Sequence, residues 1–270
     1  MHRDSRSYSP AVVEFYDRWT RSFVDGFGTT FQAGFAKRDA HSREDPTDSS
    51  VLLAERAEVS PGDRVLDAGC GVGGPAIAIA RAFGVEVHGF TVSPVQAMTA
   101  SRLIAKAGLA GRVFATLGDY HRLPVQAASF DRVLFLESCG YSPARDHLFT
   151  EAVRVLRPGG TVYVKDVFRD EDPLSPQQHA DVDEFDRLWS LASSPTLSGV
   201  ARDLANAGCE VITAGPLPIV GTDRFVGAMF EIAGPTIQLS PLGRQFFRSF
   251  EDLPLFFGEV LARKPTVSTR

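Results

Sequence analysis

The sequence predicts an α/β protein in which a mostly parallel sheet carries helices on both faces. Short apolar runs alternate with helical patterns from about residue 60 to 213, which is typical of strands joined by crossover helices. The first run ends in an acid and a glycine-rich turn, Asp-x-Gly-x-Gly-x-Gly-Gly at 67–74, before a helical pattern begins. A strand, a tight glycine turn and a helix form a nucleotide-type pocket at the carboxyl edge of a parallel sheet.

The individual elements follow from apolar periodicity and from the glycines and prolines that interrupt it. Gly108 and Gly208, for example, each follow a helical pattern and predict its end. Strands are expected at 64–68, 85–90, 113–117, 132–136, 161–167, 210–213 and 255–262. Helices are expected at 11–21 and 49–59, from the glycine turn to 83, up to 107, and at 147–156, 177–191, 198–207, 222–232 and 241–250. Because the strands are parallel, the loops that follow them are expected to share one rim.

The chain divides into a cap and a main domain. Residues 1–50 are expected to form an N-terminal helical cap that acts as a substrate lid, and residues 51–270 the main domain. Two insertions, at about 168–196 and 222–250, break the strand–helix alternation and should add to the cap. The segment 25–35 is too rich in glycine for a helix and too aromatic for a solvated loop, so it is a candidate to lie over a ligand.

Composition excludes several classes of protein. The net charge of −5 over 270 residues argues against a nucleic-acid binder that depends on a basic surface. The amino terminus has no apolar signal region and no long apolar run follows, so we expect a soluble cytoplasmic protein without a membrane span. Cys70, Cys139 and Cys209 are isolated, which predicts neither disulfides nor a protein metal site. The expected partner is a small molecule, and a homo-oligomer is left open.

Several ordered segments together resemble the class I S-adenosylmethionine-dependent methyltransferases. They are the glycine turn at 66–74, Gly-Asp at 118–119, Ser-Phe-Asp-Arg-Val at 129–133 and Leu-Arg-Pro-Gly-Gly at 156–160. The resemblance covers about residues 60–165 and implies a Rossmann-like sheet of seven strands, the last antiparallel. A dehydrogenase is disfavoured because its fingerprint is Gly-x-Gly-x-x-Gly and its second strand should end in an acid.

The resemblance also implies which residues hold the cofactor. In that family the glycine loop passes under the methionine portion, and an acid in the position of Asp119 bonds the adenine amino group. Thr91 and Gln96 would hold the ribose hydroxyls, replacing the usual acid. The full expected set is Asp67, Gly69, Cys70, Gly71, Gly73, Thr91, Val92, Ser93, Gln96, Gly118, Asp119 and Tyr120.

Thr91 narrows the resemblance to a smaller group. The segment 89–96 looks like the Gly-x-Thr-x-Ser-x-x-Gln variant of the sterol, tocopherol and prenyl diphosphate C-methyltransferases and the cyclopropane synthases. The segment 26–31 is similar to the Gly-Trp-Gly-x-Ser-Phe segment of the sterol enzymes. Glu137, at the end of the fourth strand, looks like the acidic position of the sterol and prenyl diphosphate enzymes.

If the enzyme methylates an alkene carbon, the steps of that reaction determine which catalytic residues we expect. The alkene attacks the sulfonium methyl group in line, and the resulting carbocation must be stabilised and then lose a proton. Aromatic faces can stabilise the cation, and Glu137 would serve as the base. The expected catalytic set is Glu137, Tyr16, Phe27, Phe31 and Trp189.

The diphosphate end of a prenyl diphosphate substrate requires positively charged groups in the protein. A diphosphate needs Arg, Lys or His, with Mg²⁺ as a bridging ion. The expected substrate-binding set is Lys37, Arg38, His121, Phe168, Arg169 and His179. The leading hypothesis is C-methylation of a short prenyl diphosphate, such as isopentenyl or geranyl diphosphate, in terpenoid biosynthesis. The alternatives are a small-molecule O- or N-methyltransferase of specialised metabolism, and a cofactor-binding protein that catalyses cyclisation or only binds.

Overall fold

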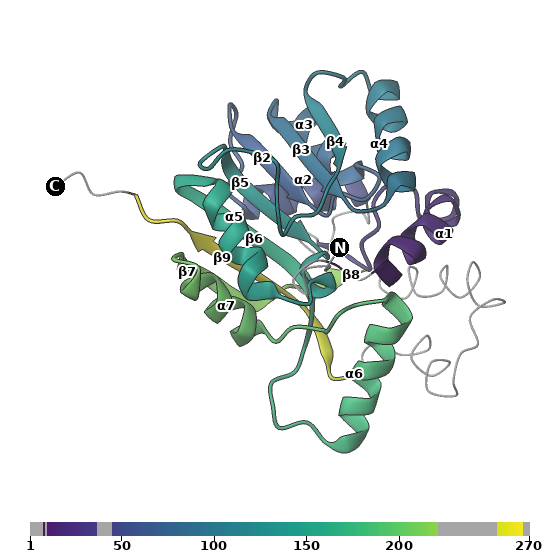
Figure 1. Cartoon of the computed structure of the whole chain (residues 1–270), viewed down its shortest axis with the longest axis vertical. Coiled ribbons are helices and arrows are strands. Elements are labelled where there is room, and N and C mark those ends of the chain that lie inside the picture. Colours follow the sequence, from purple (N-terminus) through teal and green to yellow (C-terminus); the bar gives the residue numbers. More distant parts are fainter. Residues whose placement is uncertain (1–7, 9, 37–44, 221–252, 267–270) are drawn as a thin grey trace, which may run out of the picture.

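A seven-stranded sheet forms the centre of the protein, which we analysed as a computed structural model (Figure 1). The structure describes residues 8, 10–36, 45–220 and 253–266, without the side chains of Phe27 and Val220. The strand order is β4-β3-β2-β5-β6-β9-β7, and β9 runs antiparallel to both its neighbours. The predicted mostly parallel sheet with an antiparallel last strand is confirmed. The strands are β2 (Arg64–Ala68), β3 (Glu86–Thr91), β4 (Val113–Leu117), β5 (Phe130–Leu136), β6 (Leu156–Arg169), β7 (Glu210–Pro216) and β9 (Leu255–Arg263).

Helices cover both faces of this sheet. One buried cluster joins the sheet to α5 and α7, and a second joins it to α2, α3 and α4. The helices are α1 (Pro10–Phe27), α2 (Pro46–Arg56), α3 (Gly74–Phe83), α4 (Pro94–Lys106), α5 (Arg145–Val155), α6 (Pro176–Trp189) and α7 (Leu197–Asn206), with a 3-10 turn η1 (Cys139–Tyr141). No helix in these described segments is long and apolar enough to cross a membrane.

The amino-terminal region differs from the sequence prediction in two ways. Helix α1 continues to Phe27, although the segment from residue 25 was expected to be too rich in glycine for a helix. Its end coincides with Gly28, whose φ of 82° is left-handed and whose N–H bonds to Val24 O. The second difference is the start of α2, which begins at Pro46 rather than at residue 49 and packs on α3.

A small two-stranded sheet was also missed. β1 (Phe35–Ala36) pairs antiparallel with β8 (Ile219–Val220), so the segment after α1 is joined to the segment after β7. Ala36 N–H also donates to Ser49 Oγ in α2 at 3.0 Å. We refer to residues 28–34, which lie between α1 and β1, as the strap.

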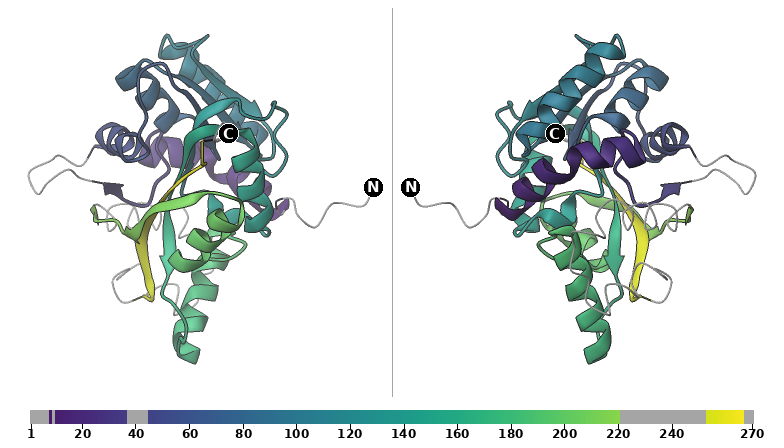
Figure 2. Two further views of the ribbon diagram at one scale, coloured as in Figure 1. Left: turned by 90° about the vertical axis from the view of Figure 1, so that its left-hand side faces the viewer. Right: turned by 90° about the vertical axis from the view of Figure 1, so that its right-hand side faces the viewer.

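The first predicted cap insertion forms α6, which extends away from the sheet (Figure 2). Ser175 begins the helix with a capping box, since its hydroxyl accepts from Gln178 N–H while the Gln178 side chain accepts from the Ser175 N–H. Val182, Phe185 and Leu188 pack against the ends of β6 and β9. The second predicted insertion, 222–250, and its two helices lie outside the described residues.

Candidate functional site

Three positions in the glycine turn after β2 favour glycine because of their backbone conformation. Gly69, Gly71 and Gly73 have φ values of 94°, 54° and 82°, which L side chains rarely adopt. A Cβ on Gly69 would lie 2.5 Å from Ser138 Cβ, in the loop after β5. The turn therefore lies directly against the loop after β5 and leads into α3, whose N-terminus has no side-chain cap.

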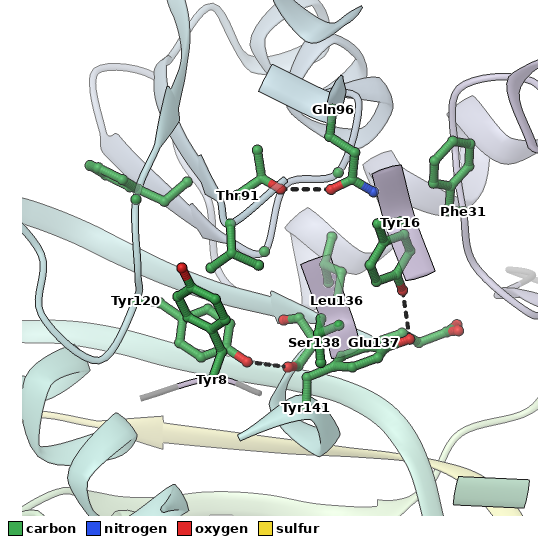
Figure 3. Close-up of a pocket in the computed structure, with 16 residues that line it drawn as sticks. Tyr8, Tyr16, Phe31, Thr91, Gln96, Tyr120, Leu136, Glu137, Ser138 and Tyr141 are labelled. Atoms are coloured by element: carbon green, nitrogen blue, oxygen red, sulfur yellow. Dashed lines mark hydrogen bonds between the residues drawn. The ribbon is translucent and has the colours of Figure 1, made fainter. Parts of the chain in front are cut away.

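A cavity of about 620 Å³, the cofactor chamber, lies along this edge of the sheet (Figure 3). The loops after β2, β3, β4 and β5 line it, together with α1 and the strap. The predicted residues that line it are Gly69, Gly71, Thr91, Val92, Gln96, Gly118 and Tyr120. Asp67 and Cys70 line a smaller adjoining cavity, whereas Gly73, Ser93 and Asp119 line neither.

Thr91 and Gln96 act as a pair at the end of β3. Thr91 Oγ1 donates to Gln96 Oε1 at 2.6 Å, and both residues are buried (Figure 3). This bond fixes the amide and leaves its NH₂ group available to the chamber. Ser93 has another role, because its Oγ accepts from Gln96 N–H as the N-cap of α4 and donates to Asp17 of α1.

Replacing Thr91 with valine is expected to weaken binding of S-adenosylhomocysteine about fivefold. The change keeps the shape of the side chain but removes the hydrogen bond that orients Gln96, a loss of about 1 kcal/mol. Isothermal titration calorimetry measures the effect. Thr99→Val is the matched control, since Thr99 Oγ1 bonds only Val95 O within α4, away from the chamber. Equal affinities for the two variants would show that the Gln96 orientation does not matter.

His121 does not lie in a substrate cavity, in contrast to the prediction. It is buried, with Nδ1 2.7 Å from Asp119 Oδ1 and Nε2 2.7 Å from Ser142 Oγ. The Asp119 carboxylate also accepts from the His121 N–H at 2.9 Å. His121 therefore connects the loop after β4 to the loop after β5, and Asp119 is oriented by this connection.

A second cavity of about 540 Å³, the acceptor chamber, adjoins the first. The two share Tyr16, Phe31, Glu137 and Tyr141, so these four residues form the boundary between them. The structure thus brings together Glu137, Tyr16, Phe31 and Trp189 of the predicted catalytic set, while the Phe27 side chain lies outside the description. The sequence prediction missed the other lining residues, Phe23, Ala33, Tyr141, Asp166, Val167, Phe185 and Leu191.

Two tyrosines face each other at the boundary between the chambers. The hydroxyl oxygens of Tyr16 and Tyr141 are 2.5 Å apart (Figure 3). Burial raises the pKa of both phenols above the ordinary value, so both remain neutral near pH 7. The pair links α1 to η1 at the boundary between the two chambers.

Glu137 is not the free carboxylate that its predicted role as a base requires. It forms an ion pair with Lys165 of β6, whose side chain is 0% exposed. Its two oxygens also accept from Ala33 N–H in the strap, at 2.9 and 3.2 Å. Lys165 Nζ in turn donates to Gly34 O at 3.4 Å. This ion pair holds the strap against the sheet.

Asp166, the next residue along β6, is a second carboxyl group in the acceptor chamber. Its oxygens accept from Cys139 N–H at 3.0 Å and from Val167 N–H at 2.9 Å. Burial, partly offset by hydrogen bonding to Cys139, raises the pKa of Asp166 to about 6. A side chain with this pKa can accept a proton near neutral pH.

The remaining predicted substrate residues are not in the acceptor chamber. Phe168 packs in the core against Phe256 and does not line the chamber, whereas its neighbour Val167 does. Arg169 pairs with Asp172 at 3.1 Å, and His179 is exposed on α6. Lys37 and Arg38 lie outside the described residues.

The described lining of the acceptor chamber contains no Arg, Lys or His. Nor does any group of three or more His, Cys, Asp or Glu in the described segments form a metal site.

The fold and the paired chambers define an α/β enzyme that binds a nucleotide-like cofactor beside a separate acceptor. Residues 65–160 match a family model described as a methyltransferase domain. The chain is 30% identical to a sterol 24-C-methyltransferase of Eremothecium gossypii, over 93% of this chain and 69% of the relative. It is 31% identical to the 27-O-demethylrifamycin SV methyltransferase of Amycolatopsis mediterranei, over 93% and 95%. The chain belongs to the class I S-adenosylmethionine-dependent methyltransferases.

Solved structures share the fold of this chain. The [4+2]-cyclase SpnF superposes with a TM-score of 0.77 and 25% identity, over 97% of this chain and all of that one. Geranyl diphosphate C-methyltransferase of Streptomyces coelicolor A3(2) superposes with a TM-score of 0.71 and 19% identity, over 95% and 98%. Asp67 fits the cofactor as well, because its buried Oδ2 has no hydrogen-bond partner among the described residues and is free for a ligand.

Proposed function

We propose that this chain methylates an alkene carbon of an isoprenoid, with a short prenyl diphosphate as acceptor. The observation that carries the proposal is the acceptor chamber, which aromatic rings from four segments line together with two carboxyl groups, next to the cofactor chamber. Apolar rings suit a prenyl chain, and a hydroxyl or amine acceptor does not require them. The similarity to the sterol and geranyl diphosphate enzymes, both C-methyltransferases, supports the same chemistry.

The chain's own residues would position the alkene and stabilise charge. S-adenosylmethionine supplies an electrophilic methyl group when bound. Tyr16, Phe31 and Trp189 present aromatic surfaces to the acceptor, each contributing roughly 0.5–2 kcal/mol toward a cation held over the ring. The carboxyl groups of Glu137 and Asp166 lie in the same chamber. Since Lys165 already neutralises Glu137, Asp166 is the better placed to take up the proton.

The diphosphate end requires positive charge that the described lining does not supply. We therefore propose that this end extends beyond the described chamber. Lys37 and Arg38 follow β1 in the sequence and are the candidates to meet it. Mg²⁺ would enter bound to the diphosphate. The structure of the geranyl diphosphate enzyme from Streptomyces coelicolor contains Mg²⁺ together with geranyl diphosphate.

The test is an assay with methyl-labelled cofactor, Mg²⁺ and a panel of acceptors. The panel contains isopentenyl, dimethylallyl and geranyl diphosphates and their free alcohols. We expect the labelled methyl group to become attached to a carbon atom of one of the diphosphates. Mass spectrometry after phosphatase treatment identifies the product. Transfer to none of the diphosphates would overturn the proposal.

One observation favours a second function, O-methylation of a hydroxyl acceptor. A buried carboxyl group with a pKa near 6 is suited to removing a hydroxyl proton, and Asp166 is such a group. The relative from Amycolatopsis mediterranei, which the chain covers almost fully, is named for a methylation on oxygen. A methyl ether product from an alcohol of the panel would establish it. Tight cofactor binding without any S-adenosylhomocysteine produced would instead favour a cyclase role, as in SpnF.

The pH profile of turnover is expected to separate the two chemistries. If Asp166 removes the acceptor's proton during transfer, kcat should fall about tenfold per pH unit below 6 and be level above it, because only the carboxylate accepts a proton. Asp166→Asn should then lower kcat by about a hundredfold and abolish this dependence. Asp203→Asn, a partly buried carboxyl group on α7, is the control. If the alkene attacks before the proton leaves, kcat should stay level between pH 5 and 8.

A further inference from the structure

A third cavity, of about 310 Å³, lies between the strap and the glycine turn. The strap contributes Thr29, Phe31 and Gln32, and the other side is formed mainly by β2, the glycine turn and the start of α3. Phe31, Gly69 and Gly71 also line the cofactor chamber, so the two cavities are continuous at the glycine turn. The third cavity is thus a side extension of the cofactor site.

Two of the residues that line this cavity carry buried polar atoms without partners. Gln32, from the strap, and Asp67, from β2, are each 2% exposed. Among the described residues, Gln32 Nε2, Gln32 Oε1 and Asp67 Oδ2 have no hydrogen-bond partner. A buried polar group left unsatisfied costs about 1–3 kcal/mol, and native proteins leave few of them. Three in one cavity indicate that a ligand completes their hydrogen bonds.

The chemistry of these atoms specifies the ligand. Asp67 Oδ2 and Gln32 Oε1 accept hydrogen bonds, while Gln32 Nε2 donates them. A ligand that satisfies all three must carry both donors and acceptors in a compact group. An α-amino acid carries an ammonium group and a carboxylate on the same carbon atom, and S-adenosylmethionine ends in such a group.

We propose that Gln32 is a cofactor ligand and that the strap binds the amino-acid end of S-adenosylmethionine. Asp67 accepts from the ammonium group, and the Gln32 amide NH₂ donates to the carboxylate. This assigns to the amino-terminal segment a part of the cofactor site in addition to the glycine turn. The assignment is independent of the acceptor and of the proposed C-methylation.

Two contacts hold the strap in the position that this role requires. At one end, the Thr29 carbonyl lies so close to Gly74 that a Cβ there would be 2.1 Å from Thr29 O. At the other end, Ala33 N–H is bonded to Glu137, which is paired with Lys165. Gln32 lies between these fixed points, so its amide is placed by the backbone on both sides.

The proposal is tested by binding, with three ligands that differ only at the amino-acid end. They are S-adenosylhomocysteine, its analogue without the carboxylate (5′-S-(3-aminopropyl)thioadenosine), and methylthioadenosine, which lacks the whole amino-acid group. Calorimetry on Gln32→Leu should show S-adenosylhomocysteine binding about tenfold more weakly, with methylthioadenosine unchanged. Gln126→Leu, an exposed glutamine on a loop, should change neither.

A second variant separates a ligand role from a role in shaping the strap. Gln32→Glu keeps the side-chain size but places a negative charge against the carboxylate. It should weaken S-adenosylhomocysteine at least tenfold while leaving the analogue without the carboxylate bound as in the wild type. Equal weakening of all three ligands by either variant, or no weakening of S-adenosylhomocysteine, would overturn the proposal.

Discussion

Replacing Lys165 with methionine is expected to lower the free energy of unfolding by about 3 kcal/mol. The side chain is fully buried on β6, where it neutralises Glu137 and lies 4.7 Å from the centre of the Phe257 ring. Methionine fills a similar volume but leaves the Glu137 carboxylate without its counter-charge, and removing one partner of a buried pair costs about 3–5 kcal/mol. The lower end applies because the Glu137 side chain is 13% exposed. Urea denaturation measures the change.

A double variant shows whether the uncompensated charge is the cause. Lys165→Met with Glu137→Gln removes both charges and should recover most of the lost stability. Lys106→Met, an exposed lysine in the last turn of α4, should stay within about 0.5 kcal/mol of the wild type. A Lys165→Met protein as stable as the Lys106 variant would contradict the assigned role of the ion pair.

Binding of S-adenosylhomocysteine is expected to weaken about tenfold per pH unit below pH 7. Burial raises the pKa of Asp67 to about 7, so below this pH the carboxyl group is protonated in the free protein. Only the carboxylate pairs with the ligand's ammonium group, and a proton must therefore leave when the ligand binds at low pH. The Cys70 thiol beside it stays neutral, because burial raises its pKa well above the ordinary value. Calorimetry at pH 5, 6, 7 and 8 gives the profile.

Two comparisons identify Asp67 as the group that titrates. Asp67→Asn should bind S-adenosylhomocysteine weakly and with little change between pH 5 and 8. Methylthioadenosine has no ammonium group, so its affinity for the wild type should be nearly independent of pH. A level profile for S-adenosylhomocysteine in the wild-type protein would refute the pairing.

Asp67 also makes the stability of the cofactor-free protein depend on pH, but this stability falls as the pH rises, whereas cofactor binding strengthens. Because its folded-state pKa lies above the value of 3.8 for an unperturbed aspartate, the folded state holds the proton more tightly. The stability contributed by this proton is complete below about pH 4 and is lost as the pH rises through 7. Cofactor binding offsets this loss, since the ammonium group then compensates the ionised carboxylate.

The sheet was predictable because its strands are defined by local patterns. Residues 64–68 and 113–117 were predicted with the bounds that the structure shows. β6 was predicted only from residue 161, but it begins at Leu156, before a Pro-Gly-Gly segment that is typical of a turn. Its first residue is a strand residue because it pairs with Phe130 of β5. The β1–β8 pair was missed for the same reason, because each of these short strands depends on a partner far away in the sequence.

The cofactor side of the site was more predictable than the acceptor side. Residues that contact a cofactor through a turn, such as Gly69 and Gly71, follow from local sequence. The acceptor chamber instead depends on which face of β6 each side chain occupies and on how the strap crosses it. The sequence prediction therefore placed Phe168 in the substrate site, although Val167 lines the chamber. Nothing in the sequence around Lys165 indicates that it pairs with Glu137. Gln32 was missed because an amide without partners is recognised only in three dimensions.

The place of β9 in the sheet has a consequence for protein synthesis. β9 lies between β6 and β7, yet it follows both of them in the sequence. Until residues 255–263 emerge from the ribosome, residues 161–169 of β6 lack their partner on that edge, and β7 lacks its partner as well. An unpaired edge of this length invites association with other nascent chains. The nascent chain thus remains open to aggregation until β9 fills the gap.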